Sequence, residues 1–378
     1  MRSIVVFTSD ENNGGIKQFA FQLLSACNSN GYEAVIMLPD LSSIRIPEEC
    51  AKQVIRFRKS KEPFGLSDKI KVVAQMINSM EPDCVLFCDD AVFSVQVLRM
   101  LNKRIRCYVT IHDVNPHPDR FNLRRRIVYE LNVFYRRIAF KRCYKVILLS
   151  QNSVFRFAKR YPTYSAKAML LPLGAHPPKG ANAQTPEEMY RCNMGKYILF
   201  FGRIERYKGV GELLDAYNML LDEQKNELNL IIAGNGRLSD YERKKAENIP
   251  QVHIVNRYID DGEMIWLFRN CICVVVPYIE ASQSGVIPMA YHFHKPVIAN
   301  NIDGLREYVI DGETGLLVNS SKELAEAMMR ICKAKDGDLE KFSINCARFE
   351  QHTFDWTSNI KRIIGENEIN GEEEGKSK

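Results

Sequence analysis

Residues 197–209 read YILFFGRIERYKG: five apolar residues in succession, a glycine, and then a charged segment ahead of an amphipathic stretch at 209–222. An apolar run without alternation is typical of a strand buried on both faces, and the stretch that follows has helical spacing. A buried strand that leads into a helix is the repeating unit of a parallel α/β sheet. This segment therefore predicts an open parallel sheet with helices on both faces.

The same unit recurs along most of the chain. Further amphipathic stretches lie at 16–29, 68–80 and 262–269. Short β-rich apolar runs alternate with them, which predicts two successive series of parallel strands. The strands are expected at 3–8, 34–38, 84–88, 106–111 and 145–149, and then at 197–201, 228–233, 252–255, 272–276 and 296–299.

The alternation stops once, at 173–195, where prolines and small polar residues have the composition of a linker. We predict an N-terminal domain at 1–172 and a C-terminal domain at 196–351. Each is expected to be a doubly wound Rossmann-like parallel sheet, and the carboxyl ends of their strands are expected to face a common cleft. Residues 367–378 contain almost nothing apolar and are expected to form a disordered tail without function.

Composition excludes several classes of protein. The 378 residues contain no run of 18 uncharged apolar residues, and the apolar run after Met1 is too short for a signal peptide. The 11 cysteines show no paired zinc-ligand spacing. This favours buried, reduced thiols in a cytoplasmic protein over a disulfide or metal framework, so no metal site is expected.

The net charge of +6 is concentrated in one segment, 120–145, which holds nine basic residues and one acidic residue. Such a local concentration argues against a generally basic nucleic-acid binder. Apolar residues at positions 123, 127, 131, 134 and 138 would form one face of a helix. A basic amphipathic helix is typical of an element that binds an anionic membrane surface, and a solvated helix packed on the sheet is the alternative. The arginines assigned to this surface are Arg124, Arg125, Arg126, Arg136 and Arg137.

Candidate ligand-binding residues in the first half follow predicted strands. Gly14 and Gly15 come after the first strand and just before a helix, where paired glycines let the backbone approach an anion. His112 follows the strand at 106–111, and a neutral imidazole there could bind a sugar hydroxyl or a carbonyl. An ordinary turn and a structural histidine are the alternatives.

The second half offers a denser set. Gly202 ends the strand at 197–201, and Arg203 and Lys208 follow it, five residues apart. A guanidinium and an ammonium together could neutralise a diphosphate without a metal, and a solvated basic turn is the alternative.

Beyond the strand at 272–276, Glu280 could accept hydrogen bonds from hydroxyls, with an exposed loop acid as the alternative. Ser284, Gly285 and Val286 could present backbone N–H groups at a helix start.

Taken in order, these residues resemble glycosyltransferase family 4, retaining enzymes of the two-domain GT-B architecture. The resemblance covers nearly the whole chain and rests on the order and spacing of modest motifs. These are Gly14-Gly15, His112-Asp113, Gly202-Arg203, Lys208-Gly209, Ala233 to Gly236 with Gly234 among them, Glu280, and the stretches Lys295–Ala299, Asp303–Glu307 and Asp311–Val318.

The resemblance implies roles. Arg203 and Lys208 would bind the diphosphate of a nucleotide-sugar donor, and Glu280 would hold hydroxyls of the transferred sugar. Gly14-Gly15 and the amides of 284–286 would approach the donor phosphates, and His112 would line the sugar pocket. A helix at 352–366 would cross back to the first domain. The family usually has a second glutamate eight positions after the first. Here that position is Pro288, so the ribose must be bound differently.

These features predict a metal-independent enzyme that transfers a hexose from a nucleoside-diphosphate sugar to a glycan or lipid-linked acceptor. It would act at the inner face of the cell membrane in surface polysaccharide synthesis. The alternative is a non-catalytic protein of the same scaffold that binds a nucleotide sugar or a membrane. A nucleic-acid partner is not expected. A dehydrogenase is disfavoured because no Gly-x-Gly-x-x-Gly follows the first strand.

Overall fold

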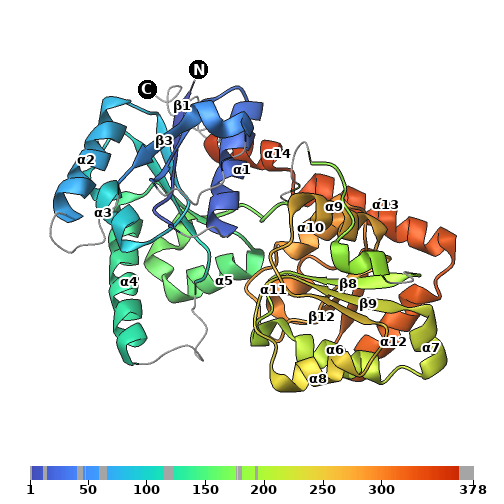
Figure 1. Ribbon diagram of the computed structural model, residues 1–378. Helices are drawn as coiled ribbons and strands as arrows, with labels where there is room; N and C mark the ends of the chain where they lie inside the picture. The colour runs from blue at the N-terminus through green and yellow to red at the C-terminus, as the bar shows by residue number, and fades with distance from the viewer. Residues whose placement is uncertain are drawn as a thin grey trace. The chain divides into compact units, whose positions relative to one another are not determined.

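The computed structural model describes residues 2–11, 15–40, 46, 48–58, 66–114, 123–175, 177, 181–191 and 195–365. The chain forms two compact units (Figure 1). Unit 1 is Met1–Pro172 together with Trp356–Lys378, and unit 2 is Leu173–Asp355. Each unit is built on a parallel sheet, of seven strands in unit 1 and six in unit 2, which confirms the predicted α/β fold class. The common cleft between the units stays a prediction.

The sheet of unit 1 has the strand order β3-β2-β1-β4-β5-β6-β7. The interior strand β1 pairs in parallel with β2 and β4, so that Val5 lies opposite both Val35 and Val85. The strands are short and almost wholly apolar because both faces are covered. Their bounds are β1 Ser3–Phe7, β2 Glu33–Pro39, β3 Val54–Phe57, β4 Cys84–Phe87, β5 Arg106–Ile111, β6 Lys145–Leu148 and β7 Ala168–Leu170.

Helices α2, α3 and α4 pack side by side on this sheet, and α1 packs against α14. The ring of Phe19 in α1 meets that of Trp356 in α14 edge to face, with 5.3 Å between centroids. The bounds are α1 Gly15–Ser29, α2 Leu66–Ser79, α3 Val92–Met100, α4 Leu123–Arg142, α5 Gln151–Arg160 and α14 Trp356–Gly365, with 3₁₀ turns η1 Glu48–Gln53 and η3 Pro162–Lys167.

The sheet of unit 2 has the order β10-β9-β8-β11-β12-β13, all parallel. Its core centres on strand residues with no solvent exposure, such as Leu199, Ile231 and Val274. The bounds are β8 Tyr197–Phe201, β9 Asn229–Ala233, β10 Val252–Val255, β11 Cys273–Val276, β12 Val297–Asn300 and β13 Gly315–Val318.

Both faces of this second sheet are covered. Figure 1 shows α9, α10 and α13 on one side and α6, α8 and α12 on the other. The bounds are α6 Val210–Asn218, α7 Asp222–Glu227, α8 Asp240–Glu247, α9 Asp261–Asn270, α10 Val286–His292, α11 Asp303–Arg306, α12 Ser321–Cys332 and α13 Asp336–Thr353, with 3₁₀ turns η4 Glu187–Arg191 and η5 Arg206–Lys208.

The segment expected to be a linker, 173–195, is partly folded onto unit 2. The Gln184 N–H donates to the Gly262 carbonyl at 2.9 Å, and Met189 is buried in the core. Glu188 forms an ion pair with Arg257 at 2.7 Å. A proline-rich composition thus did not reveal the apolar and charged anchors within this segment.

Two predicted helix boundaries differ from those in the structure, and a third prediction falls on residues that the structure does not describe. The helix expected at 352–366 begins only at Trp356, because 352 and 353 end α13. The helix expected at 209–222 ends at Asn218, and α7 begins at Asp222. The tail expected at 367–378 lies outside the described residues.

Among the described residues, no helix combines the length and the hydropathy of a membrane span. These residues also contain no cluster of three or more His, Cys, Asp or Glu side chains suited to a metal ion. The ten described cysteines are buried and free, and burial raises the pKa of, for example, Cys107 to about 11.

Candidate functional site

Each sheet reverses its strand order at one place. In unit 2 the chain runs outward from β8 through β9 to β10 and then crosses back to β11, on the other side of β8. In unit 1 the same reversal lies between β1 and β4. Ligands of open α/β sheets bind outside the carboxyl ends of the strands at such a switch point. The residues that follow β8, β11, β1 and β4 are therefore the first candidates for a site.

Glycine packing brings three loops of unit 2 together at this edge. Gly202 and Gly234, which follow β8 and β9, have φ of 121° and 143°. A Cβ on Gly234 would lie 2.0 Å from the Gly202 carbonyl oxygen, so the two loops touch through their backbones. A Cβ on Gly202 would lie 3.9 Å from Cγ2 of Val286, the first residue of α10. The predicted Gly202, Gly234 and Val286 thus share one location.

The two predicted cations lie on the loop after β8. Arg203 is 72% exposed in its side chain, and its Nη1 lies 3.0 Å from Oε1 of Glu205. Lys208 is half-buried, with its Nζ 3.7 Å from the centroid of the Tyr278 ring. Burial raises the pKa of Tyr207, and Lys208 and Arg203 act to lower it, so both cations reach one side chain electrostatically.

Glu280 is exposed on the loop after β11. The backbone beyond it is packed tightly, because a Cβ on Gly304 would lie 2.1 Å from the Ala281 carbonyl oxygen. Ser284 is buried, and its Oγ accepts a 3.2 Å hydrogen bond from the Val286 N–H. Of the amides predicted to meet phosphate, the Val286 N–H is therefore already paired, whereas Gly285 is exposed.

In unit 1, His112 directly follows β5. Its Nε2 lies 2.9 Å from the Cys88 carbonyl oxygen and so donates to it, which leaves Nδ1 of a neutral ring able to accept. The imidazole packs edge to face on Phe19 of α1, with 5.3 Å between centroids. Gly15 is exposed at the start of α1, and Gly14 lies outside the described residues.

The sequence reasoning missed a buried carboxylate beside these residues. Asp89, which comes two residues after β4, is 5% exposed. It accepts from the Thr8 hydroxyl at 3.0 Å, from the Ser9 N–H at 2.7 Å and hydroxyl at 3.0 Å, and from the Ser94 hydroxyl at 2.5 Å. Asp89 therefore fastens the carboxyl ends of β1 and β4 at the switch point of unit 1. An acid directly after a buried strand was the only sequence signal for it.

The structure corrects the prediction for the basic helix. Arg136 was assigned to a membrane or acceptor surface, but it is 8% exposed and pairs with Asp90. Its Nη1 and Nη2 donate to the carbonyls of Val114 at 3.3 Å and Asp113 at 2.9 Å. Arg136 thus links α4 to the loops that follow β4 and β5.

The predicted apolar stripe is also partly wrong, because Phe134 is 61% exposed while Ala139 and Phe140 are fully buried. Arg136 is buried on this helix and its Nε donates to the Asp90 carboxylate, whereas Phe134 faces solvent. Arg137 is exposed, as predicted. The side chains of Arg124, Arg125 and Arg126 lie outside the described residues.

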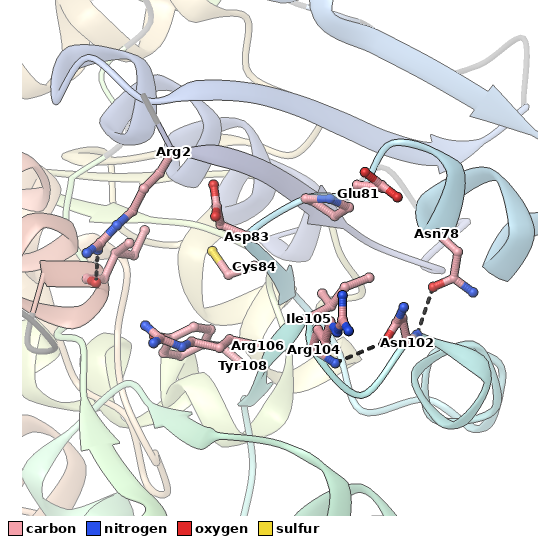
Figure 2. A pocket seen from close by; sticks show the side chains of 12 residues that line it. Arg2, Asn78, Glu81, Asp83, Cys84, Asn102, Arg104, Ile105, Arg106 and Tyr108 are labelled. Atoms are coloured by element: carbon pink, nitrogen blue, oxygen red, sulfur yellow. Dashed lines mark hydrogen bonds between the residues drawn. The ribbon is translucent and has the colours of Figure 1, made fainter. Parts of the chain in front are cut away.

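A cavity of 430 Å³ lies at the opposite, amino edge of the unit 1 sheet (Figure 2). Its charged lining is partly used within the chain. The Arg2 guanidinium donates to the Ile364 carbonyl, and the Asp83 carboxylate accepts from the Ser3 N–H at 2.7 Å. None of the predicted site residues lines this cavity.

Comparisons with known proteins agree with this organisation. Residues 195–334 match the family Glycosyl transferases group 1. The phosphatidyl-myo-inositol mannosyltransferase of Mycobacterium leprae is 25% identical over 193 residues, 50% of this chain and 51% of that protein. The alpha-1,3/1,6-mannosyltransferase ALG2 of Dictyostelium discoideum is 30% identical over 162 residues, 36% of this chain and 37% of that protein. The chain thus aligns with about half or less of the length of these relatives.

Solved structures match over almost the whole chain. Anabaena HepE in complex with UDP and glucose has a TM-score of 0.75 at 18% identity and covers 97% of this chain and 99% of its own. The lipopolysaccharide outer core galactosyltransferase WaaB has a TM-score of 0.65 at 14% identity, with the same coverage. At such identities the likeness establishes the fold. The chain therefore has the two-domain GT-B fold that the resemblance to glycosyltransferase family 4 implied, and residues 195–334 of its second unit match Glycosyl transferases group 1.

Proposed function

We propose that this protein transfers a hexose from a nucleoside-diphosphate sugar to an acceptor hydroxyl with retention of configuration. The observation that carries the proposal is the set of groups at the switch point of unit 2. There, the loops after β8 and β9 touch at Gly202 and Gly234, the start of α10 lies beside Gly202, and the ammonium of Lys208 lies against the Tyr278 ring on the loop after β11. The Glycosyl transferases group 1 match over 195–334 contains all of these residues.

The cations act on the leaving group. As the bond between the anomeric carbon and the diphosphate oxygen breaks, its electron pair passes to that oxygen. The acceptor oxygen bonds to the same face of the sugar, and its proton passes to the departing diphosphate. Fixed positive charge from Arg203 and Lys208 stabilises the charge that develops there. These two cations supply what a metal ion would otherwise supply, so we propose a metal-independent reaction.

The remaining predicted residues position the sugar and phosphates. Glu280 is exposed and can accept hydrogen bonds from sugar hydroxyls, and the Gly285 backbone is open to a phosphate oxygen. We assign Nδ1 of His112, which in the neutral ring can accept a hydrogen bond, to a sugar hydroxyl, and Gly14-Gly15 to the donor phosphates. The structures of Anabaena HepE in complex with UDP and with UDP-glucose support a uridine diphosphate sugar as the first donor to test.

For the acceptor we propose a glycan or lipid-linked glycan at the inner face of the cell membrane, in surface polysaccharide synthesis. The similarity to a phosphatidyl-myo-inositol mannosyltransferase and to a lipopolysaccharide outer core galactosyltransferase supports a lipid-linked acceptor. Arg137 and the arginines at 124–126 would contact an anionic surface. Vesicles that contain phosphatidylglycerol should sediment the protein, and vesicles of phosphatidylcholine alone should not. Equal sedimentation would refute this location.

The transfer itself is tested with purified protein and a panel of nucleotide sugars. The true donor should raise the melting temperature, because it binds the folded state alone, and should release its nucleoside diphosphate. Replacing Arg203 or Lys208 by alanine should lower the rate by about 10²–10³ while the melting temperature without donor stays at the wild-type value. Wild-type turnover in either variant would contradict the assignment.

A second candidate is a non-catalytic nucleotide-sugar binder, which Pro288 in place of the family's second glutamate favours. In that case a nucleotide sugar would stabilise the protein, yet no nucleoside diphosphate would be released with any acceptor.

A further inference from the structure

The ammonium of Lys208 lies against two aromatic rings. Its Nζ is 3.7 Å from the Tyr278 centroid and 5.4 Å from the Tyr207 centroid. The two rings meet edge to face, with 6.4 Å between centroids and 71° between planes. The face of an aromatic ring bears negative charge and attracts a cation. The cation is thus held by rings from two separate segments, η5 and the loop after β11.

The Tyr278 ring is fixed with respect to the backbone of Lys208. The ring is 1% exposed, and the carbonyl of Tyr278 accepts a 3.1 Å hydrogen bond from the Asn300 side chain. The Ile279 N–H donates to the Tyr207 carbonyl at 2.9 Å. Gly209 closes the contact, since a Cβ there would lie 1.9 Å from the Pro277 carbonyl oxygen. The loop after β11 and the turn that bears Lys208 therefore form one tight unit.

The hydroxyl of Tyr278 plays no part in this contact. It is buried and has no hydrogen-bond partner among the described residues. A buried hydroxyl without a partner destabilises the folded state, so removing it should not lower the free energy of unfolding. The ring and the hydroxyl can therefore be separated by experiment.

We propose that Tyr278 is a positioning residue that holds the ammonium of Lys208 at the carboxyl ends of β8 and β11. This inference rests on the proposed function, in which Lys208 neutralises the departing diphosphate. A free lysine side chain has many rotamers, and fixing them costs entropy. A ring that restricts the ammonium beforehand removes part of that cost from the transition state.

The test compares Tyr278→Phe, Tyr278→Leu and a matched control. Tyr278→Leu should lower kcat about tenfold, the loss of one buried cation–ring contact, with KM for the donor little changed. Tyr278→Phe should keep the wild-type kcat, because it keeps the ring. The control is Tyr241→Leu: the Tyr241 ring lies 5.1 Å from Nζ of Lys245, but that lysine is paired with Asp215. Its kcat should stay at the wild-type value.

Two results would overturn the proposal: wild-type kcat in folded Tyr278→Leu, or a Phe variant as slow as the Leu variant. If Tyr278→Leu does not fold, a trifluorinated phenylalanine at 278 preserves the shape and weakens the negative face of the ring. It should lower kcat relative to Tyr278→Phe, and an unchanged kcat would refute the role of the ring.

A readout independent of activity separates this inference from the proposed function. The Tyr278 ring should shift the ε-methylene protons of Lys208 upfield in NMR spectra, with the resonance assigned by its loss in Lys208→Gln. The shift should persist in Tyr278→Phe and vanish in Tyr278→Leu. If the wild-type protein transfers sugar but the Lys208 protons show no upfield shift, the positioning role of Tyr278 is overturned and the proposed function is not. The shift in a protein that transfers no sugar from any donor overturns the proposed function and leaves the contact standing.

Discussion

Arg136→Met should destabilise unit 1 strongly, although Arg136 belongs to the most basic segment of the chain. The Arg136 side chain is 10% exposed and its partner Asp90 is 19% exposed, so the substitution leaves a largely buried carboxylate without its cation. It also removes the donors to the Val114 and Asp113 carbonyls. Breaking a buried pair from one side costs about 3–5 kcal/mol, mostly through the charge left behind.

The chain offers a specific assay for this loss. It contains two tryptophans, Trp266 in unit 2 and Trp356 in unit 1. In a Trp266→Phe background the fluorescence of Trp356 reports on unit 1 alone, and urea unfolding then gives the free energy of that unit. The exposed neighbour Arg137 is the matched control, and Arg137→Met should change stability by less than about 0.5 kcal/mol.

If Arg136→Met lowers the free energy of unfolding of unit 1 no more than Arg137→Met does, the buried pair does not stabilise the unit. A double variant, Arg136→Met with Asp90→Asn, sharpens the result. Because the orphaned charge is then gone, its cost should fall well below the sum of the two single variants. Strict additivity would show that Arg136 and Asp90 do not stabilise each other.

Four other perturbations probe unit 2 and the chemistry. Gly234→Ala should destabilise unit 2 by more than about 1 kcal/mol, because its φ is 143° and the new Cβ would lie 2.0 Å from the Gly202 carbonyl oxygen. Gly337→Ala should stabilise unit 2 by about 0.4–1 kcal/mol, because a Cβ at this helical position meets no atom within 4 Å. If urea unfolding gave the same change in free energy for both variants, the close contact of Gly234 with Gly202 would be contradicted. The Arg257 guanidinium lowers the pKa of Glu263 from its ordinary 4.5. The ionised Glu263 therefore stabilises the folded state fully above pH 4.5, and this contribution is lost as the pH falls through the lowered pKa. Melting temperature should therefore fall less steeply with acid in Glu263→Gln than in the wild type, and identical profiles would exclude the coupling. EDTA should leave the transfer rate unchanged, and a rate that collapses with EDTA and returns with Mg²⁺ would show that the metal-independent mechanism is wrong.

The sequence predicted the buried strands well and the edges of the sheets poorly. Strands β1, β4, β8 and β11 are continuous apolar runs because they pair on both sides and are covered on both faces. The three strands that were missed, β3, β7 and β13, are each three or four residues long and lie at a sheet edge. Such short runs differ little from a loop in pattern.

The candidate site divides in the same way. The sequence could predict that Gly202 and Lys208 lie at the carboxyl end of a strand, because both are in the loop that follows the buried run at 197–201. Asp89 and Arg136 were missed or misplaced because their partners are far away in sequence: Ser9 lies 80 positions before Asp89, and Asp90 lies 46 before Arg136. A charged residue is expected to be exposed until its partner is known. Only the topology of the sheet brings such partners together.

The docking of α14 on α1 makes unit 2 an insertion within unit 1, and this bears on synthesis by the ribosome. Trp356, which covers Phe19, is translated only after all of Leu173–Asp355. The apolar face of α1 therefore stays exposed to solvent while the roughly 180 residues of unit 2 are synthesised and fold as a separate domain. During that interval the nascent first domain is the part of the chain most in need of a chaperone.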